Sequence, residues 1–173
     1  MKRILIAGIG LTAAIAAVPH LWSAATAENI QSQPQVHLNL DAQKQIVQKD
    51  KVSWQSLKDG AVVQKNDVIL YTITGQNLSD RPVKNLTINE PIPQQMAYIL
   101  KSADVDYSTG SKITFSIDGG HTFNEHPTVK VKLPNGNIET RPAPATAYTN
   151  IRLIVSVVAP KTSVKGTYQT QVK

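Results

Sequence analysis

The chain contains no cysteine among its 173 residues. The absence of thiols excludes disulfide bonds, thiolate ligands for metal ions and a cysteine nucleophile. It also excludes a lipid anchor of the lipoprotein type, which is attached to a cysteine at the cleavage point. A folded domain of this composition therefore depends on its hydrophobic core alone, and a chain of this length can bury enough apolar surface for that.

Helical periodicity and long apolar runs are also scarce. No stretch of ten residues has helical spacing, so the crossover helices that a parallel sheet needs are not predicted. Beyond the N-terminal region, no apolar run approaches the roughly 20 residues that span a bilayer. Aromatic residues make up only 5% of the chain. These features predict an all-β, antiparallel protein that is not an integral membrane protein.

The N-terminal segment has the order of features typical of an export signal. Lys2 and Arg3 give a positive start, residues 4–18 are apolar, and Ala25-Thr26-Ala27 matches the small-x-small pattern of a signal peptidase site. We therefore predict a cleavable signal peptide over residues 1–27, and expect a periplasmic, secreted or cell-surface protein. The alternative is an uncleaved amphipathic anchor.

The charge of the mature chain is modest. The formal net charge of +6 falls by two, to +4, when Lys2 and Arg3 are removed with the signal peptide. The remaining lysines are spread along the chain, whereas proteins that bind nucleic acid usually gather them on one face. Spread lysines predict a solvated surface and no nucleic-acid partner.

Residues 28–35 are polar and predict a flexible lead-in, and residues 36–173 predict one domain. Alternating or β-branched segments predict short strands at residues 36–40, 43–47, 68–74, 83–88, 96–100, 112–117, 121–123, 129–133, 151–158 and 167–172. Turn residues separate them, including Asn135-Gly136. This pattern predicts an Ig-like antiparallel β-sandwich. The expected core includes Leu70, Ile88, Phe115, Phe123, Leu153, Val155 and Tyr168.

Residues 116–123, SIDGGHTF, combine an acid, two glycines, a histidine and two hydroxyls. Asp118-Gly119 suits the positive φ angles of a tight turn, and an aspartate there accepts hydrogen bonds from backbone N–H groups just ahead. The spacing also resembles the Asp-box, a structural hairpin motif found away from catalytic centres. We therefore predict that Ser116, Asp118, Gly119, Gly120 and Thr122 form a structural turn.

Other candidate sites have weaker patterns. Asp104 and Asp106 begin a calcium-like loop, but Phe115 stands where the bidentate glutamate belongs, so only a weak Ca²⁺ site is conceivable there. Glu90 could be one of the two carboxylates of a glycosidase site, but the sequence places no second carboxylate beside it at the required separation. Trp54 is a possible contact for a ligand such as a sugar. We expect no catalytic residues, no metal ligands and no cofactor.

Several segments taken in order resemble a known family. These are residues 66–99, 113–123, 149–155 and 160–172, which contain an Asn-Asp turn, a Tyr-Thr-Ile strand, an acid followed by Ile-Pro, the Asp-Gly-Gly turn and a closing Gly-Thr strand. The pattern resembles the conserved-repeat domain of prokaryotic surface proteins, known as domain of unknown function eleven. The resemblance covers most of residues 61–172. This chain has one copy of the domain, and Leu153 replaces a frequent aromatic residue.

The resemblance implies an exported, Ig-like module without established catalytic residues. Together with the export signal, it favours a non-enzymatic protein that binds or supports an envelope protein or polymer through loops or an exposed sheet edge. The second hypothesis is a carbohydrate-binding or carbohydrate-active protein, motivated by the Asp-box-like hairpin, Trp54 and the tyrosines. A hydrolase using Glu90 or the Asp104 and Asp106 pair is the third.

The export hypothesis predicts the N-terminus of the mature protein. Expression of the whole chain in a bacterium that exports it should yield a protein that begins at Glu28, because signal peptidase cleaves after the small residue Ala27. Intact-mass measurement of the purified protein checks this. An Ala27→Arg variant should accumulate as the uncleaved chain. A native protein that retains residues 1–27 would instead support the uncleaved anchor.

Overall fold

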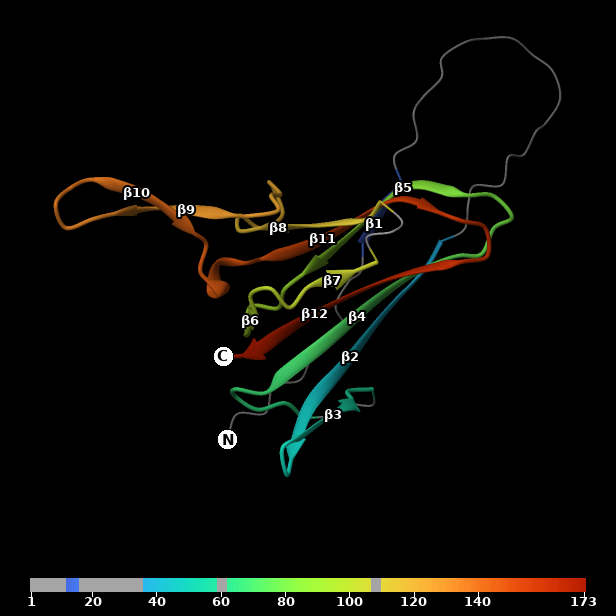
Figure 1. Cartoon of the computed structure of the whole chain (residues 1–173), viewed down its shortest axis with the longest axis horizontal. Helices are drawn as coiled ribbons and strands as arrows, with labels where there is room; N and C mark the ends of the chain where they lie inside the picture. The colour runs from blue at the N-terminus through green and yellow to red at the C-terminus, as the bar shows by residue number, and fades with distance from the viewer. Residues whose placement is uncertain (1–11, 16–35, 59–61, 107–109) are drawn as a thin grey trace, which may run out of the picture.

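The structure is a computed structural model that describes residues 12–15, 36–58, 62–106 and 110–173. Within these ranges the regular elements are strands and one short 3₁₀ helix, η2, and all strand pairs are antiparallel (Figure 1). The strands are β1 (Thr12–Ile15), β2 (Val36–Gln48), β3 (Lys51–Ser56), β4 (Val68–Asn77), β5 (Val83–Pro91), β6 (Met96–Tyr98), β7 (Asp104–Val105), β8 (Lys112–Ser116), β9 (Thr128–Lys132), β10 (Ile138–Pro142), β11 (Asn150–Val158) and β12 (Ser163–Val172), and η2 spans Ala145–Ala147. The prediction of an all-β, antiparallel protein is confirmed.

The strands form two layers that enclose the core. One sheet has the order β3-β2-β4-β12-β6, with β7 also paired to β12, and the other has the order β1-β5-β11-β8. The layers lie close together where β4 connects to β5 and β11 connects to β12, and they diverge toward the opposite end (Figure 1). We call the end at which the layers diverge the open end. The β9–β10 pair is a separate hairpin that extends from this end.

Alternation along the central strands produces the core. Every second side chain is buried along β4, along β12 and along β11 as far as Val155, because successive side chains of a strand point to opposite faces. Tyr71 of β4 and Tyr168 of β12 are directly paired across the sheet, and their rings stack with centroids 5.0 Å apart. Fully buried aromatic pairs of this kind contribute both area and favourable ring geometry to the core.

The predicted strands are mostly confirmed, with several changes of boundary. Residues 36–40 and 43–47 belong to one continuous strand, β2, and the sequence analysis did not predict its partner β3. Residues 121–123 form no strand, so that prediction is wrong. Arg141 and Pro142 end β10 and do not belong to a loop. The predicted hairpin at Asn135-Gly136 connects β9 and β10, and Gly136 has a φ of 86°.

The expected core is confirmed in part. Ile88, Leu153, Val155 and Tyr168 are buried. The prediction that Leu70 belongs to the core is wrong, because Leu70 lies on the other face of β4. The buried positions of this strand include Ile69, Tyr71 and Ile73. The run of apolar residues in β4 covers both faces, so the sequence does not reveal which one is buried.

The two predicted core phenylalanines are only half-buried. The ring of Phe123 lies under the guanidinium of Arg152, whose carbon is 3.4 Å from the ring centroid. The same guanidinium donates a hydrogen bond to Oδ1 of Asn89 at 2.6 Å. Phe123 therefore covers a charged side chain outside the core. Phe115 lines a pocket described below.

β1 lies within the predicted signal peptide, residues 1–27. Its backbone pairs with β5, where Thr12 is opposite Asn89 and Ile15 is opposite Leu86. Residues 1–11 and the lead-in at 28–35 lie outside the described ranges, and cleavage of the signal peptide stays a prediction. None of the helices in the described ranges has the length and apolar character that crossing a membrane requires.

The buried side chain of Asn77 joins the two places where the chain crosses between the sheets. Its amide nitrogen donates to the carbonyl oxygens of Arg81, Val158 and Ala159 at 2.7, 3.1 and 3.1 Å. Its amide oxygen accepts from the backbone N–H and the hydroxyl of Ser79 at 3.0 and 2.7 Å. This amide group therefore joins the β4–β5 and β11–β12 connections, to which Lys161 adds a hydrogen bond to the carbonyl of Leu78 and an ion pair with Asp80.

The role of Asn77 can be tested by truncation. Asn77→Ala should lower the free energy of unfolding by about 3 kcal/mol, because it leaves buried carbonyl groups of both connections without a donor. Chemical denaturation monitored by circular dichroism measures this loss. Asn135→Ala, in the exposed β9–β10 turn, is the matched control and should cost less than about 1 kcal/mol. Equal effects of the two substitutions would contradict the role assigned to Asn77.

Candidate functional site

The Asp118 carboxylate forms hydrogen bonds with its own turn. Oδ1 accepts from the Ser116 hydroxyl at 2.6 Å and from the backbone N–H groups of His121 and Thr122 at 3.1 and 2.9 Å. Oδ2 accepts from the Thr122 hydroxyl at 2.5 Å. These bonds, first those from Ser116 and then those from Thr122, hold the pKa of Asp118 well below its usual range. The charge of Asp118 thus stabilises the turn.

The two glycines give this turn its shape. Gly119 and Gly120 have φ angles of 75° and 89°, in the left-handed region that favours glycine. The N–H of Gly120 donates to the Ser116 hydroxyl oxygen at 2.8 Å, and the N–H of Gly119 donates to the Thr149 hydroxyl at 3.0 Å. The turn is therefore attached to the residue that precedes β11.

The turn also positions the segment that follows it. Phe115 and Asn124 exchange two backbone hydrogen bonds of 2.8 and 2.9 Å, and the N–H of Ala143 donates to the carbonyl of Pro127 at 2.9 Å. Residues 124–127 are thus fixed between β8 and the end of β10. All five residues of the predicted structural turn take part in this arrangement, and they lie beside a pocket.

The pocket has a volume of about 540 Å³ and lies at the open end of the two layers. This volume falls within the range of about 300–1,000 Å³ that is typical of small-molecule sites. Its walls come from β6, the β6–β7 connection, β8, the segment after the Asp118 turn, and the region from β10 to η2. The lining residues are Tyr98, Leu100, Lys101, Ala103, Lys112, Ile113, Phe115, Glu125, His126, Pro127, Pro142, Ala143 and Tyr148.

Three aromatic rings contact one another in the pocket wall. The centroid of Tyr98 lies 5.2 Å from that of Phe115 and 5.0 Å from that of Tyr148, and Phe115 and Tyr148 are 5.4 Å apart in an edge-to-face arrangement. Tyr98 is buried, whereas Phe115 and Tyr148 are half-buried. The hydroxyl of Tyr98 accepts a hydrogen bond from the N–H of Ala103 at 3.2 Å. The cluster therefore offers a preformed apolar surface.

Charged side chains occur at exposed positions of the lining. Lys101, Lys112, Glu125 and His126 are exposed. The ion pairs of the described residues are Lys44 with Asp67, Lys58 with Asp41, Arg141 with Glu139 and Lys161 with Asp80. None of them involves either lysine of the pocket, so both ammonium groups lack a carboxylate partner within the described ranges.

Glu90 lies in the core, away from the pocket lining. Its side chain is buried, and neither carboxylate oxygen has a hydrogen-bond partner among the described groups. Burial raises the pKa of Glu90 to about 8. Burial, and after it the charge of the Glu90 carboxylate, raises the pKa values of Tyr71 and Tyr168. Glu90 is thus an acid kept neutral near pH 7, enclosed between the sheets.

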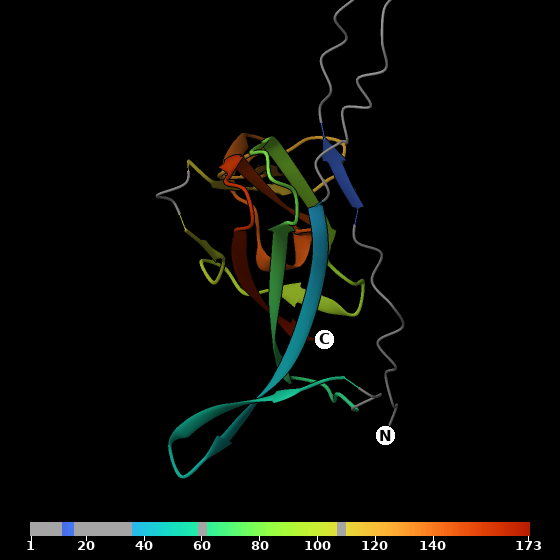
Figure 2. The ribbon, with the colours of Figure 1, turned by 90° about the vertical axis from the view of Figure 1, so that its right-hand side faces the viewer.

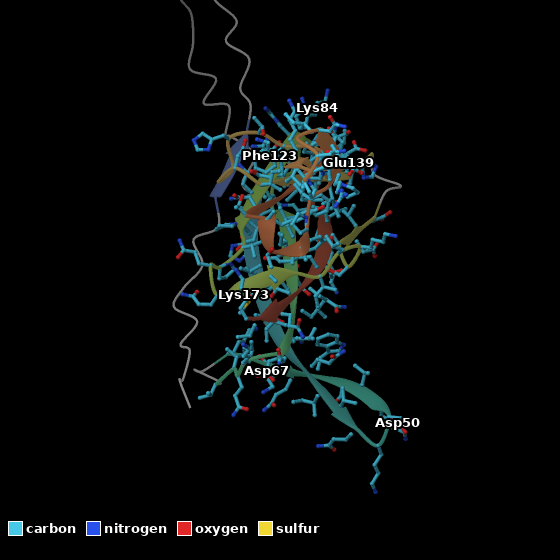
Figure 3. The ribbon with its side chains drawn as sticks, turned by 90° about the vertical axis from the view of Figure 1, so that its left-hand side faces the viewer. Asp50, Asp67, Lys84, Phe123, Glu139 and Lys173 are labelled. Atoms are coloured by element: carbon cyan, nitrogen blue, oxygen red, sulfur yellow. The ribbon has the colours of Figure 1, made fainter. Side chains whose placement is uncertain are left out.

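The remaining candidates are not gathered into the pocket. Trp54 is half-buried on β3, in the β2–β3 hairpin that projects from the body (Figure 2). Asp50, at the tip of this hairpin, lies at the opposite end of the molecule from Phe123 and Glu139 (Figure 3). The role of Trp54 in ligand binding stays a prediction.

Asp104, which begins the calcium-like segment, is an exposed residue of the short strand β7. Residues 107–109 of the calcium-like segment lie outside the described ranges. Within the described ranges, no three His, Asp or Glu side chains form a group that could hold a metal ion.

Comparison of the chain with known proteins finds no matching family model, no matching characterised protein and no matching solved structure.

The sequence analysis missed the pocket. Tyr98, Phe115 and Tyr148 come from three segments far apart in the chain, and no local pattern predicts that they meet. The scarcity of aromatic residues in the sequence does not indicate where the rings gather, because that depends on how the segments pack.

The neutral acid in the core predicts a pH dependence of stability. The pKa of Glu90 in the folded protein, about 8, lies above the ordinary value of 4.5 that applies to the unfolded chain. Stability from this group is therefore fully present below pH 4.5 and is lost as pH rises toward 8. Glu90→Gln should remove this loss. The difference in free energy of unfolding, variant minus wild type, should therefore increase by on the order of 3 kcal/mol between pH 5 and pH 8.5.

Denaturation curves collected at several pH values measure this difference. Glu125→Gln, a change of the same type at an exposed position, is the control and should leave the pH profile of the wild type unchanged. A wild-type stability that is constant from pH 5 to pH 8.5 would show that Glu90 is not held neutral.

Proposed function

We propose that this protein is an exported, non-enzymatic, Ig-like module that binds a component of the cell envelope or cell surface. The binding site is the pocket of about 540 Å³, and the observation that carries the proposal is its aromatic wall of Tyr98, Phe115 and Tyr148. Pockets that combine apolar walls with a few polar groups are typical of ligand sites. The export signal and the resemblance to conserved-repeat surface domains support the location.

The chemistry of the pocket favours binding over catalysis. Its described lining contains no serine, threonine or cysteine. It does contain lysines, Glu125 and His126, but within the described ranges no hydrogen bond or ion pair joins these side chains into a nucleophile–base pair. The two acids with shifted pKa values lie elsewhere: Asp118 is bound by its own turn and Glu90 is enclosed in the core. A hydrolase that uses Glu90 would need a path from solvent to a fully buried side chain.

The carbohydrate hypothesis has less support from this pocket. Sugars carry many hydroxyls, and sites for them need several hydrogen-bonding side chains. The described lining contains no asparagine, glutamine, aspartate or arginine. Of the aromatic residues that motivated the hypothesis, Trp54 belongs to the β2–β3 hairpin and does not line the pocket, whereas Tyr98 and Tyr148 do.

Photo-cross-linking in intact cells tests the proposal. A photoreactive amino acid at Leu100, which lines the pocket and is 47% exposed, should give a specific product with an envelope component. Tyr148→Ala in the same chain should reduce the yield about tenfold, because loss of a contacting aromatic side chain removes apolar burial.

The matched control places the photoreactive residue at Val157 of β11, which is 44% exposed and lies outside the pocket lining. It should not give the Tyr148-dependent product. Products that form equally at both positions, or that do not depend on Tyr148, would refute the pocket as the binding site.

A further inference from the structure

We propose that the pocket selects an amphipathic organic anion, with an apolar body against the aromatic wall and an acidic group held by Lys101 and Lys112. This inference rests on the proposed binding function and adds the chemical class of the ligand. Three features of the pocket carry it: its apolar interior, its two unpaired lysines and the anchored backbone of one of them.

The interior suits an apolar body. Beside the three aromatic rings, the walls consist of aliphatic and proline side chains, including Ile113, Ala143 and Pro127. Contact with such walls removes apolar surface of a ligand from water at a gain of about 25 cal/mol per Å². A strongly hydrated ligand would lose more hydration free energy on entering the pocket than its contacts with this apolar lining would restore.

The lysines provide the complementary charge. Lys101 lies in the β6–β7 connection and Lys112 begins β8, so two separate segments bring positive charge to the same pocket. Neither forms an ion pair with a carboxylate of the described residues. Glu125 of the same lining carries a negative charge that opposes an anion. The two lysines leave the lining with an excess of one positive charge, which favours an acidic ligand.

The backbone of Lys101 is held in place at the pocket. Its φ is 65°, in the left-handed region, a conformation that it shares with Lys49 and Lys161 in other turns. The hydroxyl of Ser102 anchors the same connection to β12, since it donates to the carbonyl of Gln169 at 3.3 Å and accepts from its N–H at 2.9 Å. The side chain of Lys101 therefore starts from a fixed point in the pocket wall.

Two fluorescent probes with the same ring skeleton test the inference. One is 8-anilinonaphthalene-1-sulfonate, an anion, and the other is N-phenyl-1-naphthylamine, which lacks the sulfonate. The full chain should bind the anion at one site, about tenfold more tightly than the neutral amine, since a hydrogen bond to a charged group contributes about a factor of ten or more. Raising the salt concentration should weaken the binding of the anion and leave the binding of the neutral amine unchanged.

Three variants assign the effect to the pocket. The double variant Lys101→Ala/Lys112→Ala should reduce the affinity for the anion to that for the amine and leave the amine within about twofold of the wild type. Lys84→Ala/Lys165→Ala removes two exposed lysines outside the pocket lining, and should leave both affinities unchanged. Tyr148→Ala should weaken both probes. Circular dichroism of each variant verifies that it is folded.

The outcomes separate this inference from the proposed function. Equal affinities for the two probes, both reduced by Tyr148→Ala, would overturn the preference for anions while the pocket remains an apolar binding site. If Tyr148→Ala changes neither affinity in a folded protein, the pocket binds no apolar group, and both proposals fail. Loss of anion binding in the control double variant as well would assign the effect to overall charge and refute the role of Lys101 and Lys112.

A competition experiment distinguishes two sources of the anion. Decanoate represents free organic acids, and phosphatidylglycerol vesicles represent a lipid surface. Displacement of the bound sulfonate by decanoate alone would assign the pocket to free acids, and displacement by the vesicles would assign it to anionic lipid. If neither displaces the sulfonate from the wild type, the inference that the pocket takes amphipathic anions of this kind is refuted.

Discussion

The buried amide of Asn77 determines the geometry of the two layers at one end. The chain crosses from one sheet to the other after β4 and crosses back after β11, and Asn77 forms hydrogen bonds with both connections. The layers can therefore diverge only toward the opposite end (Figure 1). Side chains from β6, β8 and the region around η2 surround the space there, and the pocket lies among them. A sandwich held closed at both ends would have filled the same space with core.

The two acids of the fold with shifted pKa values show how environment decides what a carboxyl does. Asp118 is exposed, but hydrogen bonds from Ser116 and Thr122 keep it ionised. Glu90 lies in the core without a hydrogen-bond partner, and desolvation keeps it neutral. The first acid fixes a loop that leads into the pocket wall, and the second makes the stability of the core depend on pH. Neither acid lines the pocket.

Much of the strand pattern was predictable because alternation and turn residues are local signals. The segment containing Tyr71, the hairpin at Asn135-Gly136 and the turn at Asp118 all occur where the sequence placed them. The errors also have a common origin. Leu70 and Phe123 were assigned to the core on apolar character alone, but whether a strand face or a loop side chain is buried depends on the layer that packs against it. The pocket was not predicted for the same reason.

The sequence by itself determined that the protein is built from antiparallel strands and that residues 116–122 form a turn, since both follow from backbone preferences over a few neighbouring residues. The tertiary structure alone decided that Tyr98, Phe115 and Tyr148 share one wall and that Lys101 and Lys112 belong to the same pocket. It also decided that Glu90 is enclosed. These features depend on contacts between segments far apart in the chain, which form only when the two sheets pack together.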